Sequence, residues 1–224
     1  LDLDITITDS NIVQTFDINS DANWWKVASI NSLDFNQPTH THTVRGYMST
    51  VYVMDSGIEE THPEFTGVDI VKLYSFTGDF TDTRGHGTAL ASLISGKNCG
   101  LTGATVKVVK IFDPSVETKQ SDLLAAFDAI IAHAESTPFP SVVNLSWIID
   151  KNAFIESKIQ KLIDNNIAVV CSAGNSGTPI PNVTPASMPD VSGDWDILEV
   201  EDEKRYKATL DKSGNGPYTQ QGGR

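Results

Sequence analysis

The sequence predicts an α/β fold in which a doubly wound, mostly parallel sheet is covered by helices on both faces. Between residues 49 and 172, short β-branched apolar segments alternate with longer segments of helical character. Residues 106–112 and 167–171 are largely apolar on both faces, which is typical of buried parallel strands. The length of 224 residues, 39% of them hydrophobic, allows one sizeable core rather than two domains.

Each element is indicated by its local composition. Strands are predicted at 49–55, 104–112, 141–146 and 167–172, and the first feeds a turn at Asp55-Ser56-Gly57. Helices are predicted at 85–96, 121–135 and 153–165; the first ends on a glycine, and Ser121 is a suitable N-cap for the second. Prolines that break regular structure follow residue 176, at Pro179, Pro181, Pro185 and Pro189.

The two ends of the chain differ in composition from its middle. Residues 1–22 are acidic and polar, with an alternation that predicts one edge strand in a leader segment. Residues 23–191 are predicted to form the main domain. Residues 192–224 are charged and then glycine-rich, which predicts a poorly ordered tail.

Charge and cysteine usage exclude several classes of function. The 29 acidic and 16 basic residues give a net charge of −13, which disfavours nucleic acid and anionic membranes as partners. No apolar run approaches the roughly 18 residues of a membrane span. An acidic surface favours solubility, and a structural calcium ion held by carboxylates is the alternative explanation. Cys99 and Cys171 are predicted to be buried free thiols. The compartment is left open.

Three short motifs are predicted where strand ends meet loops, which is where functional groups gather in an open α/β sheet. They are Asp55-Ser56-Gly57, Gly85-His86-Gly87-Thr88 and the Ser-Ala-Gly-Asn-Ser-Gly segment at 172–177. Alone, each has a plain structural reading as an Asx turn, a helix cap or a glycine-rich turn. Their order along the chain is more informative, because the third motif follows the second after two further βα units.

This order resembles that of the subtilisin-like serine proteases, and within them the proteinase K branch. The resemblance includes the surroundings of the motifs, in segments 52–58, 62–67, 100–104, 109–111 and 143–146. It covers roughly residues 23–191 and implies that residues 1–22 correspond to the end of a prodomain and its link to the mature enzyme.

The resemblance implies a catalytic role for three residues. Asp55 would accept a hydrogen bond from His86, and His86 would act as the general base. Asn175 would donate its side-chain amide to the developing oxyanion. We therefore expect Asp55, His86 and Asn175 to converge at the carboxyl edge of the sheet.

The resemblance also implies a peptide or protein substrate that lies extended and adds to the site as a β-strand. Two segments would flank it, one formed by Ser146, Trp147 and Ile148 and the other by Ser172, Ala173 and Gly174. No cofactor and no catalytic metal are required.

The chain departs from the family at the nucleophile. The family carries this serine in a Gly-Thr-Ser motif at a helix start, many tens of residues after the oxyanion asparagine, and no Gly-Thr-Ser occurs in the 224 residues. Ser187 has a following methionine but lies soon after Asn175 between Pro185 and Pro189, which prevent a helix. Ser187 is therefore not predicted to be the nucleophile.

A second departure lies on the substrate strand. Where the family has Ser-Leu-Gly, this chain reads Ser146-Trp147-Ile148. A β-branched side chain in place of glycine predicts a narrowed first specificity pocket. A locally shifted alignment is the alternative reading.

Two functions follow from these observations. The first is a serine endopeptidase of this family, represented here by a C-terminally incomplete fold that is inactive alone because its nucleophile is absent or supplied by a second fragment. The second is a non-catalytic scaffold or assembly protein with the same fold. Asp55, His86 and Asn175 favour the first, whereas the missing serine and Ile148 favour the second. In both cases we expect a C-terminal fragment or another chain to cover the apolar faces left open beyond Asn175.

Overall fold

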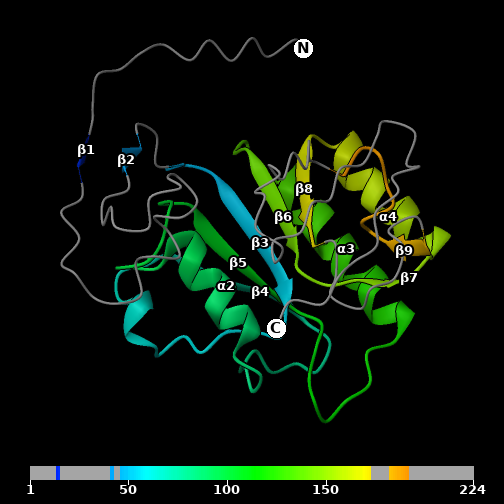
Figure 1. Cartoon of the computed structure of the whole chain (residues 1–224), viewed down its shortest axis with the longest axis horizontal. Coiled ribbons are helices and arrows are strands. Elements are labelled where there is room, and N and C mark those ends of the chain that lie inside the picture. Colours follow the sequence, from blue (N-terminus) through cyan, green and yellow to red (C-terminus); the bar gives the residue numbers. More distant parts are fainter. Residues whose placement is uncertain (1–13, 16–40, 43–45, 173–181, 192–224) are drawn as a thin grey trace, which may run out of the picture.

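A five-stranded parallel sheet forms the centre of the molecule (Figure 1). The computed structural model describes residues 14–15, 41–42, 46–172 and 182–191. The strand order is β4-β5-β3-β6-β8, and every neighbouring pair runs parallel. The bounds are β3 Thr50–Asp55, β4 Ile70–Ser75, β5 Thr105–Lys110, β6 Ser141–Leu145 and β8 Ile167–Cys171.

Helices cover the sheet from both sides, which confirms the predicted doubly wound α/β fold. Helices α3 (Gln120–Glu135) and α4 (Ala153–Asp164) bury their apolar residues in the larger core, against Tyr52, Val143 and Val169 of the sheet. Helix α2 (His86–Ser95) lies on the other face, where Ala91 joins a smaller core with Val53, Val106 and Val108. The alternation of strand side chains between the two faces explains why adjacent residues join different cores.

Four short strands and one 3-10 turn complete the described residues. Strands β1 (Gln14–Thr15) and β2 (Thr41–His42) pair antiparallel, as do β7 (Ile149–Asp150) and β9 (Val183–Thr184). The 3-10 turn η1 (Pro63–Phe65) places Phe65 in the smaller core.

Strand β4 is the principal element that the sequence prediction missed. It lies at one edge of the sheet, its residues are mostly half-buried, and its pairing with β5 shifts between Lys72 and Tyr74. Lys72 and the bulge interrupt the apolar alternation that reveals the other strands, because an edge strand needs less burial than a central one.

The N-cap predicted for α3 is corrected by the structure. Helix α3 begins at Gln120, so Ser121 lies inside its first turn and Lys119 is the residue at the cap. The Asp122 carboxylate accepts a hydrogen bond from the Lys119 backbone N–H at 2.8 Å. A side chain from within the first turn therefore stabilises this end of the helix.

Both cysteines are free, as predicted. Cys171 is buried at the end of β8, and burial raises the pKa of its thiol to about 12; Cys99 is half-buried.

Nearly all of the predicted leader at 1–22, and the tail at 192–224, lie outside the described residues. None of the helices within the described part of the chain has the length and apolar character to cross a membrane.

Among the described residues, only part of the sheet face on which α2 lies is covered. Helix α2 packs over β3 and β5. On β8, the side chains alternate between buried and exposed, and Ala168 and Val170 are the exposed ones. Within the described residues, β8 is also the last strand of the sheet, so its outer edge pairs with no other described strand.

Candidate active site

Asp55 is the last residue of β3 and is almost completely buried, with 2% of its surface exposed. It pairs in register with Lys110, the last residue of β5. Its Oδ1 accepts a hydrogen bond from the Ser56 backbone N–H at 2.8 Å. The parallel sheet therefore places the Asp55 carboxylate at the carboxyl edge of the sheet, and the following turn fixes the orientation of this side chain.

The N-terminus of α2 packs directly against the turn that follows Asp55. The Gly87 N–H donates to Ser56 Oγ at 3.0 Å. A Cβ atom on Gly87 would lie 2.5 Å from the Gly57 carbonyl oxygen, and one on Gly57, whose φ is +111°, would lie 2.4 Å from the Phe80 oxygen. Glycine is needed at both positions because backbone meets backbone there.

Asp82 holds the loop that precedes α2 to the first turn of the helix. Its Oδ1 accepts from the N–H groups of Arg84 and Gly85, at 3.0 and 2.8 Å, and its Oδ2 accepts from the Thr88 N–H and hydroxyl, at 2.9 and 2.6 Å. Burial opposes ionisation of this carboxyl, but these hydrogen bonds keep the pKa of Asp82 below its usual value. Asp82 thus satisfies donors that the helix N-terminus would otherwise leave without partners.

His86 is the first residue of α2, and its ring lies against Asp55. The distance from His86 Nδ1 to Asp55 Oδ1 is 2.8 Å. The His86 side chain is 46% exposed, whereas that of Asp55 is 2% exposed. Because a carboxylate only accepts, the contact holds the proton on Nδ1 and leaves Nε2 as the accepting nitrogen.

The two oxygens of Asp55 differ in their surroundings. Oδ1 accepts from both Ser56 and His86. Oδ2 is buried, and none of the described residues donates a hydrogen bond to it. The hydrogen bonding that the described residues offer this carboxylate is therefore directed to the oxygen that holds His86.

Ser146 and Ser172 follow two neighbouring strands, β6 and β8. Leu145 and Cys171 are paired in register, and the Ser172 N–H donates to the Leu145 carbonyl at 3.1 Å. Ser146 Oγ exchanges hydrogen bonds with the Asn144 side chain. The structure thus places these two predicted substrate-flanking residues side by side at the carboxyl edge.

Trp147 occupies a different environment from the one its predicted role implies. Its side chain is only 7% exposed, contacts Phe112 and Phe127, and donates from Nε1 to the Met54 carbonyl at 2.9 Å. The indole therefore belongs to the core, and contact with substrate is left to the Trp147 backbone. Ile148 is half-buried and packs partly against the same core, so its narrowing of a pocket stays a prediction.

Three predicted site residues, Ala173, Gly174 and Asn175, lie outside the described residues. Their convergence with Asp55 and His86 therefore stays a prediction. Ser187 lies in the loop after β9, where its hydroxyl donates to Glu156 of α4. The described part of the chain contains no group of three or more His, Cys, Asp or Glu residues arranged to hold a metal ion, and the structural calcium ion also stays a prediction.

Sequence reasoning missed residues that position the site. Asp82 and Lys110 lie outside the three motifs, so motif order assigns no role to either residue. The signal for Asp82 is its place before Gly85-His86 at a helix start, which is typical of a capping residue. The signal for Lys110 is a lysine within an apolar strand, which in a doubly covered sheet requires buried partners.

Comparisons with known proteins bear on the family and the fold. The model of the subtilase family (Peptidase_S8) matches residues 46–217. The subtilisin-like serine protease AsES of Sarocladium strictum is 32% identical over 171 residues, which are 75% of this chain and 44% of that protein. Proteinase T of Parengyodontium album is 27% identical over 168 residues, which are 73% of this chain and 57% of that protein.

Solved structures give the same result. The crystal structure of a cold adapted subtilisin-like serine proteinase matches with a TM-score of 0.60 and 28% identity, over 70% of this chain and 56% of that chain. The chain thus spans about half the length of the relatives that it matches.

Proposed function

The chain belongs to the subtilase family, with proteinase K-type fungal proteases among its relatives, and from this premise we propose that it carries the acid–base part of a serine endopeptidase site. The observation that carries the proposal is the 2.8 Å contact between the buried Asp55 and the half-exposed His86. In this proposal the nucleophilic serine comes from polypeptide outside the 224 residues.

The proposed mechanism follows from the orientation of the His86 ring. With Nδ1–H donated to Asp55, Nε2 accepts the proton of a serine hydroxyl as that oxygen attacks the scissile carbonyl. Asp55 stabilises the imidazolium that results and keeps the ring in the correct tautomer. The side-chain amide of Asn175 donates to the oxyanion, and loss of such a donor costs about 10²–10³ in rate in subtilisin.

We propose a peptide or protein as the substrate. Its backbone would lie extended between Ser146 and Ser172, which follow adjacent parallel strands, and would hydrogen-bond there as an added strand. The indole of Trp147 would support this segment from below rather than touch the substrate.

We also propose a partner for the open face of the sheet. The match covers 44% of the AsES protease and 57% of proteinase T. More than two fifths of each of these relatives therefore lies outside the matched region. The exposed row on β8, including Val170, provides apolar surface for such a segment. Polypeptide of this kind beyond the 224 residues, on the same chain or on another, would supply both the cover and the serine.

A fluorophosphonate reagent tests the proposal on the protein purified by affinity tag from its native source. We expect a serine in polypeptide outside the 224 residues, on the same chain or a co-purifying one, to become labelled, and we expect no serine within the 224 residues to react. His86→Ala should abolish the label without releasing the partner, because base catalysis is lost while the interface is retained.

Two outcomes would contradict the proposal. Labelling of a serine within the 224 residues, Ser187 included, would show that the nucleophile is not supplied from outside. A stable assembly in which no polypeptide reacts would favour the non-catalytic scaffold.

A further inference from the structure

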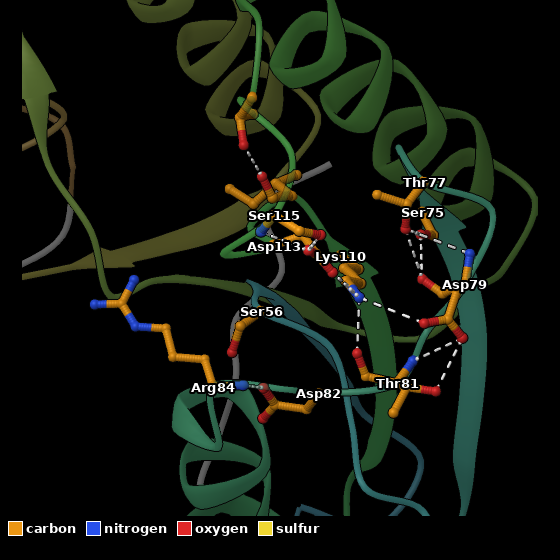
Figure 2. A network of polar contacts seen from close by, with 12 residues as sticks. Ser56, Ser75, Thr77, Asp79, Thr81, Asp82, Arg84, Lys110, Asp113 and Ser115 are labelled. Carbon is orange, nitrogen blue, oxygen red and sulfur yellow. Dashed lines mark hydrogen bonds and ion pairs between the residues drawn. The ribbon is translucent and has the colours of Figure 1, made fainter.

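Lys110 is a fully buried cation at the carboxyl edge of the sheet, with 0% of its side chain exposed. Its ammonium donates to the Thr81 carbonyl at 2.7 Å and forms ion pairs with Asp113 at 2.9 Å and with Asp79 at 3.6 Å (Figure 2). Burying an ammonium group is expensive without such partners. A chain that only needed a filled core would carry an apolar residue here.

The three partners of Lys110 lie on two different loops. Asp79 and Thr81 belong to the loop between β4 and α2, whereas Asp113 follows β5. Asp113 also accepts from the Ser115 N–H and hydroxyl, and these bonds together with Lys110 lower the pKa of Asp113 to about 2. The ammonium group therefore connects loops that have no strand pairing with each other.

The loop held by Lys110 is the one that positions His86. Thr81 pairs with Ile58 in an isolated bridge, and the hydrogen bonds on either side run from Ile58 N to Phe80 O at 2.8 Å and from Asp82 N to Ile58 O at 3.3 Å. These bonds fasten the loop to the turn that follows Asp55.

Beyond the bridge, Asp82 is the next residue after Thr81 and caps the first turn of α2, where His86 lies. The path from Lys110 to the imidazole thus runs through the Thr81 carbonyl, the Asp82 carboxylate and the helix start. The hydrogen bonds along this path are all shorter than 3.4 Å, and the Asp82 residue at its centre is buried.

Lys110 also approaches the turn that follows Asp55 directly, through its aliphatic stem. The residues Asp55 and Lys110 are register partners on adjacent parallel strands, and residues at equivalent register share a face of the sheet. The Lys110 Cδ lies 3.2 Å from the position that a Cβ on Gly57 would occupy. The aliphatic stem of the lysine therefore packs beneath the same turn that its ammonium group connects to the His86 loop.

We propose that Lys110 is a positioning residue of the catalytic pair, which sets the His86 ring against Asp55 by anchoring the 79–82 loop. The inference rests on the proposed function, because the positioned group is the proposed general base. Lys110 contacts no reacting atom. Its effect is on the geometry of the Asp55 to His86 hydrogen bond and on the tautomer that this bond selects.

The test measures the tautomer of His86 by ¹⁵N NMR at neutral pH, with the ¹⁵N label on the histidines of the protein purified together with any polypeptide bound to it, and needs no catalytic activity. In the parent chain, we expect the proton to reside on Nδ1. In Lys110→Met, which keeps most of the stem and removes the charge, the ratio of Nδ1–H to Nε2–H forms should fall by about tenfold, as for the loss of one charge-assisted hydrogen bond. Lys110→Arg, which keeps the cation, should restore much of the ratio.

Lys107→Met is the matched control. Lys107 lies on the same strand, but its half-buried side chain projects from the opposite face. This variant should leave the tautomer ratio unchanged. The double variant Lys110→Met with Asp113→Asn serves where the single variant does not fold. It neutralises the Asp113 carboxylate, whose side chain is 12% exposed, whereas the Asp79 side chain is 62% exposed and stays hydrated without Lys110.

Several results would overturn the inference. One is an unchanged tautomer ratio in folded Lys110→Met or in the double variant. Another is failure of both to fold while Lys107→Met folds, because Lys110 would then be a general determinant of folding. The proposed function fails independently of this inference if no serine reacts with the fluorophosphonate while NMR still finds the His86 proton on Nδ1.

Discussion

The atoms around Asp55 and His86 show how two short motifs become one site. Ser56, Gly57 and Gly87 have little chemistry of their own, yet they let a helix start approach a strand end to within backbone contact. The spacing of acid and histidine motifs was visible in the sequence. The closeness of the two backbones was not, because it depends on the absence of Cβ atoms at positions that come together only in the fold.

Prediction at the residue scale succeeded where a role depends on local chemistry. Asp55 and His86 were identified from motif order, and their side chains lie 2.8 Å apart. His133 lies outside the motifs, and the structure places it half-buried, with Nδ1 2.8 Å from the hydroxyl of the buried Tyr52. Long-range partners such as these leave no periodic signal in the sequence.

Asp82→Ala should destabilise the protein by roughly 2 kcal/mol at pH 7, since it removes a helix cap and leaves several backbone donors without a partner. The pKa of Asp82 is lowered in the folded state, so its stabilisation is present above the unfolded value near 3.9 and is lost as the pH falls through the lower folded value. The difference between parent and variant in urea midpoint should therefore shrink toward acid pH.

Asp128→Ala is the control for this measurement. Asp128 is largely exposed and pairs with Lys158, so its removal should cost at most about 1 kcal/mol. Equal losses for Asp82→Ala and Asp128→Ala at pH 7 would contradict the capping role.

At the scale of elements, burial decided what could be predicted. Strands β3, β5, β6 and β8 and helices α2, α3 and α4 were placed within about two residues, because each has a strong apolar pattern. Strand β4 was missed because it is a half-buried edge strand with a bulge. Helix ends were less predictable, since a cap is chosen by geometry among several suitable residues.

The ends of α3 and α4 give a direct test of that point. Asn152 caps α4 by accepting from the N–H groups of Phe154 and Ile155 at 3.1 and 3.2 Å, so Asn152→Ala should cost about 1 kcal/mol in free energy of unfolding. Ser121→Ala should change it by less than about 0.5 kcal/mol, because Ser121 lies inside the first turn of α3. Chemical denaturation measures both, and a larger loss for Ser121→Ala would reverse the assignment of the cap.

At the scale of the whole molecule, the sheet has unequal cover on its two faces. The larger core extends under α3 and α4 across β3, β6 and β8, whereas the smaller core under α2 is centred on β3 and β5. The sequence predicted an open face only through the family resemblance. Periodicity alone could not do so, because a buried and an exposed valine look the same in a strand pattern.

Because the described residues leave part of one sheet face uncovered, we predict that the chain is stable only when further polypeptide packs against that face. At about 25 cal/mol per Å², each ~100 Å² of apolar surface left exposed forgoes about 2.5 kcal/mol, an appreciable part of the ~5–15 kcal/mol stability of a whole domain. Sedimentation at low micromolar concentration should therefore show the 24.3 kDa chain within larger particles.

Val170→Lys places a charge on the exposed row of β8, where Val170 is 37% exposed, and should release a smaller, less stable species. Phe154→Lys should not do so, although Phe154 is 70% exposed, because it lies at the start of α4 on the covered side. A compact monomer of the parent chain with a cooperative melt would mean that the open face needs no cover, and the proposed partner would then have to be abandoned.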